Sequence, residues 1–287
     1  MEMKQDQDQG KVIGYLGPRG TYTEEAALLV CGGQESRLRE YRTIDSAIRA
    51  VMEEAVDQCV VPLENSLEGA VTVTLDTLAH DVNLFICREI ILPVRHHLLV
   101  KGGTEQIDII LSHPQALAQC RRYLTRAYPG AEVRSVESTA EAASRVAAGA
   151  IHHGAVGSSR AAALYGLTVK AEDIQDHSTN CTRFVLLGRQ EALPLAGRTY
   201  KTSVACQIDG RRPGSLCEIL QEFSHRAVNL SRIESRPARS GLGVYIFFLD
   251  IEGGLHEPPV KEAVAAAAAK SLWFKSFGTY LTDNRVG

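Results

Sequence analysis

Short strand patterns alternate with helix starts along the first 190 residues, and this alternation limits the fold more than any other feature. Five apolar runs, beginning with "KVIGYL" (11–16), are each followed by a turn rich in hydroxyl or amide side chains and then by a helix pattern. Thr21, Ser112 and Ser138 each precede a Glu or Gln by three residues, which is the spacing of a capping box. Alternating strands and helices predict an α/β fold with βαβ units and a mostly parallel sheet.

The five capped turns also predict what such a fold binds. Helix N-termini expose unpaired N–H groups and the positive end of the helix dipole, so they attract carboxylates and phosphates. In open α/β sheets, ligands lie beyond the carboxyl ends of the strands, where these turns lie. One Ser or Thr at a helix start is usually only a cap. Five such turns together predict a cleft for a small anion.

Two segments predict a division into two lobes. The extended run "EIILPVRHHLLV" (89–100) is typical of a crossover strand, and "RFVLLGR" (183–189) is typical of a return strand. We therefore expect a catalytic unit over 11–190, with lobe 1 at about 11–90 plus 184–190 and lobe 2 at about 91–183. The cleft would lie between the lobes, beside "HSTNCTRFVLLG" (177–188).

A second unit follows a linker at 193–199. Its patterns run strand, helix, strand, strand, helix, strand, with a turn at 238–241, over residues 200–285. This order predicts a ferredoxin-like βαββαβ unit.

Composition and charge exclude several classes. The net charge is −3 with both signs dispersed, so no nucleic-acid footprint is expected, and no apolar run is long enough to span a membrane. Seven scattered cysteines without CxxC pairs predict reduced thiols in a cytoplasmic protein, with no disulfide framework and no metal site.

The motifs "GPRGTYTEEAA", "VPLENSLEGAV", "SHPQALAQC" and "NCTRFVLLG", in this order, resemble the prephenate dehydratase family, and "RPGSLCEIL" with "NLSRIESRP" resembles the ACT regulatory domain. The resemblance covers about 11–285. It implies two lobes like those of a periplasmic binding protein and conversion of prephenate to phenylpyruvate, water and CO2 in phenylalanine biosynthesis. It also implies inhibition by L-phenylalanine at paired ACT domains in a homodimer or homotetramer, and no cofactor. Only about ten residues precede the first strand, so no chorismate mutase activity is expected.

Three adjacent residues are the predicted catalytic group. Thr182 is expected to protonate or hydrogen-bond the leaving hydroxyl, and Arg183 offers the rigid donor fork that suits a carboxylate. Phe184 either excludes water beside the substrate ring or is core. Glu64 is expected to orient an arginine or the backbone, and His113 is an alternative acid or a structural residue.

The remaining predicted contacts form two sets. The substrate-binding set is Thr21, Glu64, Asn65, Ser66, Ser112, Gln115 and Asn180. The set for allosteric phenylalanine is Gly214, Ser215, Leu216, Asn229, Leu230, Glu234, Ser235 and Arg236. Two other functions also fit the sequence, an arogenate dehydratase and a non-catalytic binding protein or sensor for a small anion.

Overall fold

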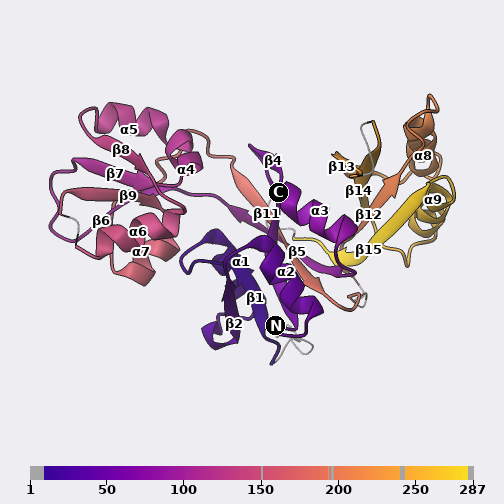
Figure 1. The fold of residues 1–287 in the computed structure, drawn as a ribbon, viewed down its shortest axis with the longest axis horizontal. Helices are drawn as coiled ribbons and strands as arrows, with labels where there is room; N and C mark the ends of the chain where they lie inside the picture. The colour runs from indigo at the N-terminus through magenta and orange to yellow at the C-terminus, as the bar shows by residue number, and fades with distance from the viewer. Residues whose placement is uncertain (1–9, 150, 193, 195–196, 240–242, 284–287) are drawn as a thin grey trace.

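The protein is described by a computed structural model that covers residues 10–283 except 150, 193, 195–196 and 240–242. Three units lie in a row (Figure 1). Lobe 1 occupies the centre, lobe 2 lies at one end, and the C-terminal unit lies at the other. Parts of the expected linker (193–199) and of the expected turn (238–241) fall outside the described residues.

Lobe 1 is a mixed sheet with helices packed against it. Its sheet order is β5-β11-β3-β1-β2, with β4 beside β3; β1 is parallel to β2 and β3, and β11 is antiparallel to β3 and β5. The elements are β1 (Ile13–Leu16), α1 (Tyr22–Val30), the 3-10 helix η1 (Glu35–Arg37), β2 (Leu38–Tyr41), α2 (Ile44–Met52), β3 (Gln58–Asn65), β4 (Gly69–Ala70), α3 (Thr72–His80), β5 (Phe85–Pro93) and β11 (Cys181–Gly188).

Lobe 2 is built around a five-stranded sheet of order β10-β6-β9-β7-β8, in which β7 is parallel to β8 and β9 and the other pairs are antiparallel. Its elements are β6 (His97–Val100), β7 (Ile109–Ser112), α4 (Pro114–Gln119), α5 (Arg121–Ala127), β8 (Glu132–Ser135), α6 (Thr139–Ala147), β9 (His153–Gly157), α7 (Ser159–Tyr165) and β10 (Thr168–Ala171). The prediction of a mostly parallel sheet is wrong for both lobes, because the strands next to each crossover run antiparallel to their neighbours.

The C-terminal unit has the predicted βαββαβ order and an antiparallel sheet of order β13-β14-β12-β15. Its elements are β12 (Tyr200–Gln207), α8 (Ser215–Ser224), β13 (Leu230–Pro237), β14 (Tyr245–Glu252), α9 (Pro258–Ala269) and β15 (Trp273–Leu281). The end of β15 pairs with β5, so this sheet continues into that of lobe 1.

One hydrophobic core joins lobe 1 to the C-terminal unit. Leu63 and Leu75 of lobe 1 lie in the same buried cluster as Phe248, Phe277 and the ring of Tyr280. Phe248 and Phe277 are stacked, with ring centroids 5.9 Å apart. Because shared apolar burial resists separation, the C-terminal unit is fixed against lobe 1.

The predicted caps form at Thr21 and Ser138, whose side chains accept from the backbone N–H three residues on. Ser112 is a correction: its hydroxyl is buried and donates to the Val156 carbonyl at 2.7 Å. The side chain of His113 caps α4 instead, by accepting the backbone N–H of Gln115. Within the described part of the chain, no helix is long and apolar enough to cross a membrane.

Candidate functional site

The candidate site lies on the strand pair β3–β11, where the two connections between the lobes meet lobe 1. Thr182 pairs in register with Asn65, and Arg183 pairs with Glu64. Since successive side chains on a strand point to opposite faces, the two pairs serve different sides of the sheet.

Asn65 determines which way the Thr182 hydroxyl can donate. Its Oδ1 accepts the backbone N–H groups of Leu67 at 3.0 Å and Glu68 at 3.2 Å. Both partners are obligate donors, so they fix the orientation of the Asn65 amide. Its Nδ2 therefore donates to Thr182 Oγ1 at 2.9 Å. Thr182 accepts this bond, which leaves the hydroxyl proton free to be donated elsewhere.

Asn180 and Gln119 extend this group into lobe 2. Asn65 Nδ2 also donates to Asn180 Oδ1 at 2.9 Å, and Asn180 Nδ2 donates to Gln119 Oε1 at 2.9 Å. The same oxygen lies 3.0 Å from His96 Nε2, so that ring nitrogen is the donor. Burial lowers the pKa of His96, and the bond to Gln119 opposes this. Gln119 thus joins both interlobe connections, 94–96 and 172–180.

Sequence reasoning did not predict Gln119 or His96. Gln119 lies in the segment "SHPQALAQC" and His96 in the connection after β5, but nothing in the sequence shows that the two meet, and only the fold brings Gln119 next to Asn180.

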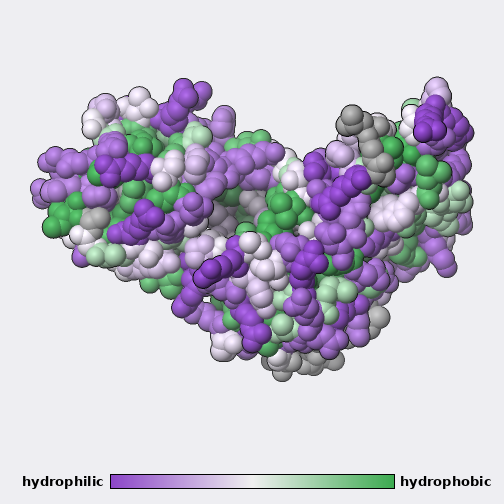
Figure 2. Space-filling view, in the orientation of Figure 1, coloured by the Kyte–Doolittle hydropathy of each residue, from purple (hydrophilic) through white to green (hydrophobic). Residues whose placement is uncertain are grey.

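The other predicted substrate contacts differ in their burial and in their partners. Ser66 accepts the Cys181 N–H at 3.0 Å and stays exposed. Thr21 is half-buried at the start of α1, and Gln115 is half-buried in the first turn of α4. Ser112 faces the interior of lobe 2 and is not available to a ligand. Figure 2 shows the surface hollowed over β4 and β11, between lobe 2 and the C-terminal unit.

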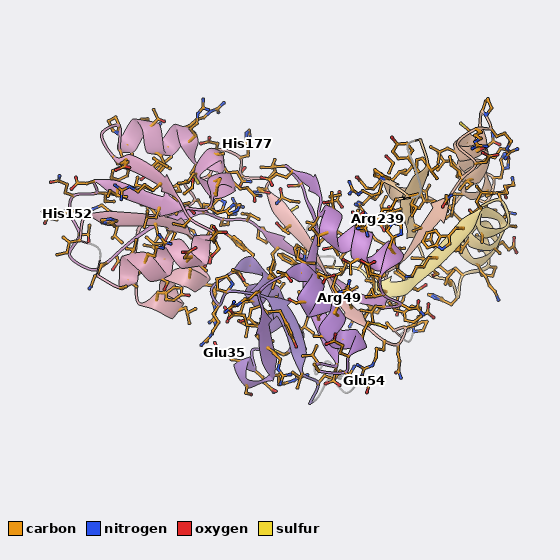
Figure 3. The ribbon with its side chains drawn as sticks, viewed as in Figure 1. Glu35, Arg49, Glu54, His152, His177 and Arg239 are labelled. Atoms are coloured by element: carbon orange, nitrogen blue, oxygen red, sulfur yellow. The ribbon has the colours of Figure 1, made fainter. Side chains whose placement is uncertain are left out.

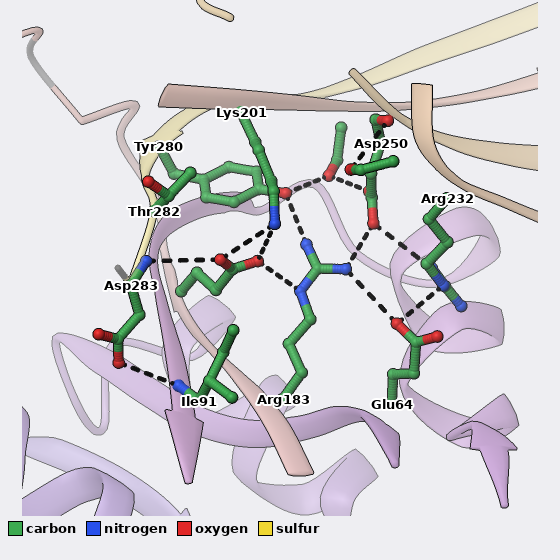
Figure 4. A network of polar contacts seen from close by, with 12 residues as sticks. Glu64, Ile91, Arg183, Lys201, Arg232, Asp250, Tyr280, Thr282 and Asp283 are labelled. Atoms are coloured by element: carbon green, nitrogen blue, oxygen red, sulfur yellow. Dashed lines mark hydrogen bonds and ion pairs between the residues drawn. The ribbon is translucent and has the colours of Figure 1, made fainter. Parts of the chain in front are cut away.

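Arg183 faces the C-terminal unit, on the other side of the strand pair (Figure 4). Its Nη1 lies 2.5 Å from Asp250 Oδ2 and its Nε lies 2.6 Å from Glu89 Oε2. Its Nη2 donates to Tyr280 Oη at 2.8 Å. Burial alone would lower the pKa of Arg183, but Tyr280, Asp250 and Glu89 raise it above its ordinary value. The sequence predicted that Arg183 binds a substrate carboxylate. The structure corrects this prediction, because the buried guanidinium is already bound by protein groups.

Phe184 is also a correction. It is buried in the core of lobe 1 with Val60, Ile90 and Leu92. The core alternative therefore describes Phe184, and the ring has no surface to offer a ligand.

Glu64 joins the cluster around Arg183. Its Oε2 lies 3.7 Å from Arg183 Nη1 and 3.2 Å from Arg232 Nε. The register of β3 against β11 shifts between Arg183 and Phe184, which leaves Leu63 as an extra residue. This bulge allows both the apolar Leu63 and the charged Glu64 to face the C-terminal unit.

A separate ion network holds the two lobes together. Arg160 at the start of α7 contacts Glu24 at 3.3 Å and Glu35 at 2.6 Å, and Arg19 contacts the same two carboxylates. Glu35 lies on the side of lobe 1 that faces lobe 2 (Figure 3). Ser158 adds a hydrogen bond to the Gly20 carbonyl at 3.2 Å. The capped turn at Ser158 is thus filled by protein and not by a ligand.

The predicted effector residues lie at two ends of the C-terminal unit. Gly214, Ser215 and Leu216 open α8 at the same end of the sheet as Glu234, Ser235 and Arg236, the last of which binds Asp76 of α3. Asn229 and Leu230 lie at the opposite end of β13. One chain therefore does not bring the whole set together.

The structure holds no metal-binding group within the described residues: no set of three or more His, Cys, Asp or Glu side chains could hold an ion there.

Comparison with known proteins fits this architecture. Residues 13–192 match the model of the family "Prephenate dehydratase". The chain belongs to the prephenate dehydratase family. Residues 210–269 match the ACT domain, so the C-terminal unit is an ACT domain.

Two curated relatives cover most of the chain. A prephenate dehydratase from Mycolicibacterium vanbaalenii is 38% identical over 96% of this chain and 92% of its own length. A bifunctional chorismate mutase/prephenate dehydratase from Stutzerimonas stutzeri is 41% identical over 93% of this chain and 72% of its own length.

Two solved structures share the whole fold. A prephenate dehydratase from Arthrobacter aurescens, in complex with L-Phe, is 37% identical with a TM-score of 0.86 and covers 94% of this chain and 89% of its own. A chain described as a novel type of quorum quenching acylase is 28% identical with a TM-score of 0.85 and covers 96% of this chain and 99% of its own.

The polarity of the Asn65–Thr182 bond can be reversed by Asn65→Asp. The new oxygen still caps the turn at 67–68, but the atom facing Thr182 becomes an acceptor and takes the hydroxyl proton. We expect kcat for prephenate to fall at least about 100-fold with the fold retained. Leu67→Asp is the matched control, because it adds the same charge on an exposed side chain and should act on KM alone. A variant Asn65→Asp that changes only KM contradicts this reading.

The buried carboxylate of Asp250 gives a pH-dependent prediction. Burial alone would raise its pKa, but Arg183, Arg232 and the Ser203 hydroxyl together hold the pKa of Asp250 below its ordinary value. Its stabilisation is therefore present above the unfolded-state pKa of about 3.9 and is lost as the pH falls through the folded-state value. We expect Asp250→Asn to lower the free energy of unfolding by about 2 kcal/mol at pH 7, and the difference to shrink below about pH 4. Urea unfolding across pH measures this, and a pH-independent difference contradicts it.

Proposed function

We propose that the group around Thr182 and Asn65 converts prephenate to phenylpyruvate, water and CO2. The observation that carries this proposal is the direction of the Asn65–Thr182 hydrogen bond, because it leaves the proton of the Thr182 hydroxyl available for donation to a ligand. Prephenate carries a ring hydroxyl that must leave, and a positioned donor is what this leaving group requires.

The proposed reaction balances with one proton. The bond between the ring and its carboxylate breaks, CO2 departs, and the electron pair enters the ring. The C–O bond to the hydroxyl breaks at the opposite ring carbon, and the oxygen takes a proton from Thr182 to leave as water. Thr182 recovers a proton from solvent. A threonine hydroxyl is a poor acid, so proton transfer and C–O cleavage proceed together.

The neutral character of the group suits a decarboxylation. Asn65, Ser66, Asn180 and Thr182 offer amide and hydroxyl groups, while Arg183 lies on the other face of the strands. A cation held against the departing carboxylate would stabilise the ground state more than the transition state, in which that charge is lost. We propose that Thr21, Ser66 and Gln115, with the helix starts that carry Thr21 and Gln115, bind the substrate.

Three alternatives remain distinguishable by substrate. Arogenate differs from prephenate only by an amino group in place of the side-chain oxo group, so it tests substrate preference. A binding protein or sensor would bind prephenate without product. An acylase, the description of one structural relative, would release a carboxylic acid from an acyl amide.

We propose that L-phenylalanine inhibits through paired ACT domains. β13 is an edge strand of its sheet. Antiparallel pairing of two β13 edges about a twofold axis brings the Asn229–Leu230 end of one strand to the Ser235–Arg236 end of the other. This explains why one chain separates the predicted effector residues, and it makes the protein a homodimer or a dimer of dimers. None of the seven cysteines, all of which the structure describes, forms a disulfide, and this supports the proposal of a cytoplasmic location.

Removal of the Thr182 hydroxyl tests the proposed activity. We expect Thr182→Ala to abolish formation of phenylpyruvate, followed by its absorbance in alkali, and Thr182→Ser to retain a measurable rate because it keeps the hydroxyl. Unchanged circular dichroism shows that the fold survives. Near-normal turnover by Thr182→Ala would sink the assignment.

Ser235 tests the effector site. Its side chain is exposed on β13, so its loss should spare the fold. We expect Ser235→Ala to raise the phenylalanine concentration for half-inhibition about five- to tenfold, as for one lost hydrogen bond, with uninhibited kcat unchanged. Ser224→Ala, exposed at the end of α8, is the matched control. Equal loss of inhibition in both variants would argue against a site on β13.

A further inference from the structure

The charged cluster behind the candidate site joins three strands of lobe 1 to the ACT domain. Lobe 1 contributes one cation and two carboxylates, Arg183, Glu64 and Glu89. The ACT domain contributes two cations and one carboxylate, Lys201, Arg232 and Asp250. The lobe 1 residues therefore carry a net charge of −1 and the ACT-domain residues a net charge of +1. The cluster is neutral only when the ACT domain packs against lobe 1.

Because most of these charges are buried, the ACT domain cannot shift against lobe 1 without a large cost in free energy. The side chains of Arg183, Glu89, Arg232 and Asp250 are each no more than 10% exposed. Asp250 is held further by Ser203, and the Ser203 hydroxyl contacts Tyr280 at 2.7 Å. Because each buried charge left without its partner is costly, a shift of the ACT sheet must be followed by movement of Arg183.

Arg183 is the next residue after Thr182, so a movement of the Arg183 backbone also moves Thr182. Arg183 follows Thr182 on β11, and its register partner Glu64 precedes Asn65 on β3. The two residues that form the catalytic hydrogen bond are thus each adjacent to a residue held by the ACT domain. A rotation or slide of either strand changes the distance from Asn65 Nδ2 to Thr182 Oγ1.

We infer that Arg183 is a positioning residue through which the ACT domain sets the geometry of the Thr182–Asn65 pair. This inference rests on the proposed function. It also supplies a path for the effector: β13 carries Arg232 between Asn229–Leu230 and Ser235–Arg236, so a ligand that shifts β13 moves Arg232 against Glu64.

The kinetic test compares two ion pairs across the same domain interface. Asp250→Asn weakens the cluster behind Thr182, whereas Asp76→Asn removes the peripheral contacts to Arg236 and Arg239. We expect Asp250→Asn to lower kcat for prephenate about 10- to 100-fold with KM within about twofold. Asp76→Asn should leave both unchanged. Arg183→Lys should lower kcat similarly, and the double variant Arg183→Lys/Asp250→Asn should lose less than the product of the single losses.

Tyr280→Phe is a second, milder variant that keeps the test valid if Asp250→Asn does not fold. It removes only the hydroxyl that accepts from Arg183 Nη2, and we expect a smaller fall in kcat in the same direction, with L-phenylalanine inhibition weakened. Normal kcat in both Asp250→Asn and Tyr280→Phe, or an equal fall in Asp76→Asn, overturns the inference.

Hydrogen exchange separates this inference from the proposed function. If the wild-type chain does not turn over prephenate, the proposed function fails, but backbone exchange still reports on strand positions. We expect faster exchange in peptides 58–66 and 180–188 in Asp250→Asn than in Asp76→Asn, measured by mass spectrometry. Equal exchange in the two variants refutes the positioning role whatever the activity.

Discussion

The hydrogen bond from Asn65 to Thr182 is the interaction on which the rest of the site depends. Its direction follows from two backbone N–H groups in the turn after β3, which occupy the only acceptor of the Asn65 amide. The turn therefore fixes the orientation of the amide, the amide donates to Thr182 Oγ1, and the proton of the Thr182 hydroxyl stays available for donation. No titratable group is needed for this polarity, so the donor state of Thr182 does not depend on pH.

The two faces of the β3–β11 strand pair carry different kinds of side chain. One face carries the neutral hydrogen-bonding group that spans the connections between the lobes, through Asn180 and Gln119. The other carries a cluster of six charges shared with the ACT domain, four of them buried. In the proposed function and the inference about Arg183, chemistry and regulation therefore use opposite faces of the same two strands. This arrangement separates the cations from a substrate that must lose a carboxylate.

The sequence predicted element order well and side-chain direction less well. The capping boxes and strand runs located most elements but missed β2, α2, β4 and β10, whereas the βαββαβ order of the ACT domain followed from periodicity alone. The roles of Arg183 and Phe184 could not be read in this way, since a strand pattern does not tell which face meets a partner domain. The prediction of a cap at Ser112 is wrong for another reason. Its hydroxyl donates to a buried carbonyl, and His113 caps the helix. Gln119 became visible only when the two interlobe connections were side by side.

The most direct test of the account is a crystal structure with an analogue of prephenate whose ring is fully saturated. Such a ligand keeps both carboxylates and the hydroxyl but cannot become aromatic. The account predicts that the ligand hydroxyl lies about 2.7 Å from Thr182 Oγ1, while Asn65 Nδ2 still donates to the same oxygen. A ligand hydroxyl bound elsewhere, or a carboxylate held by the Arg183 guanidinium, would contradict it.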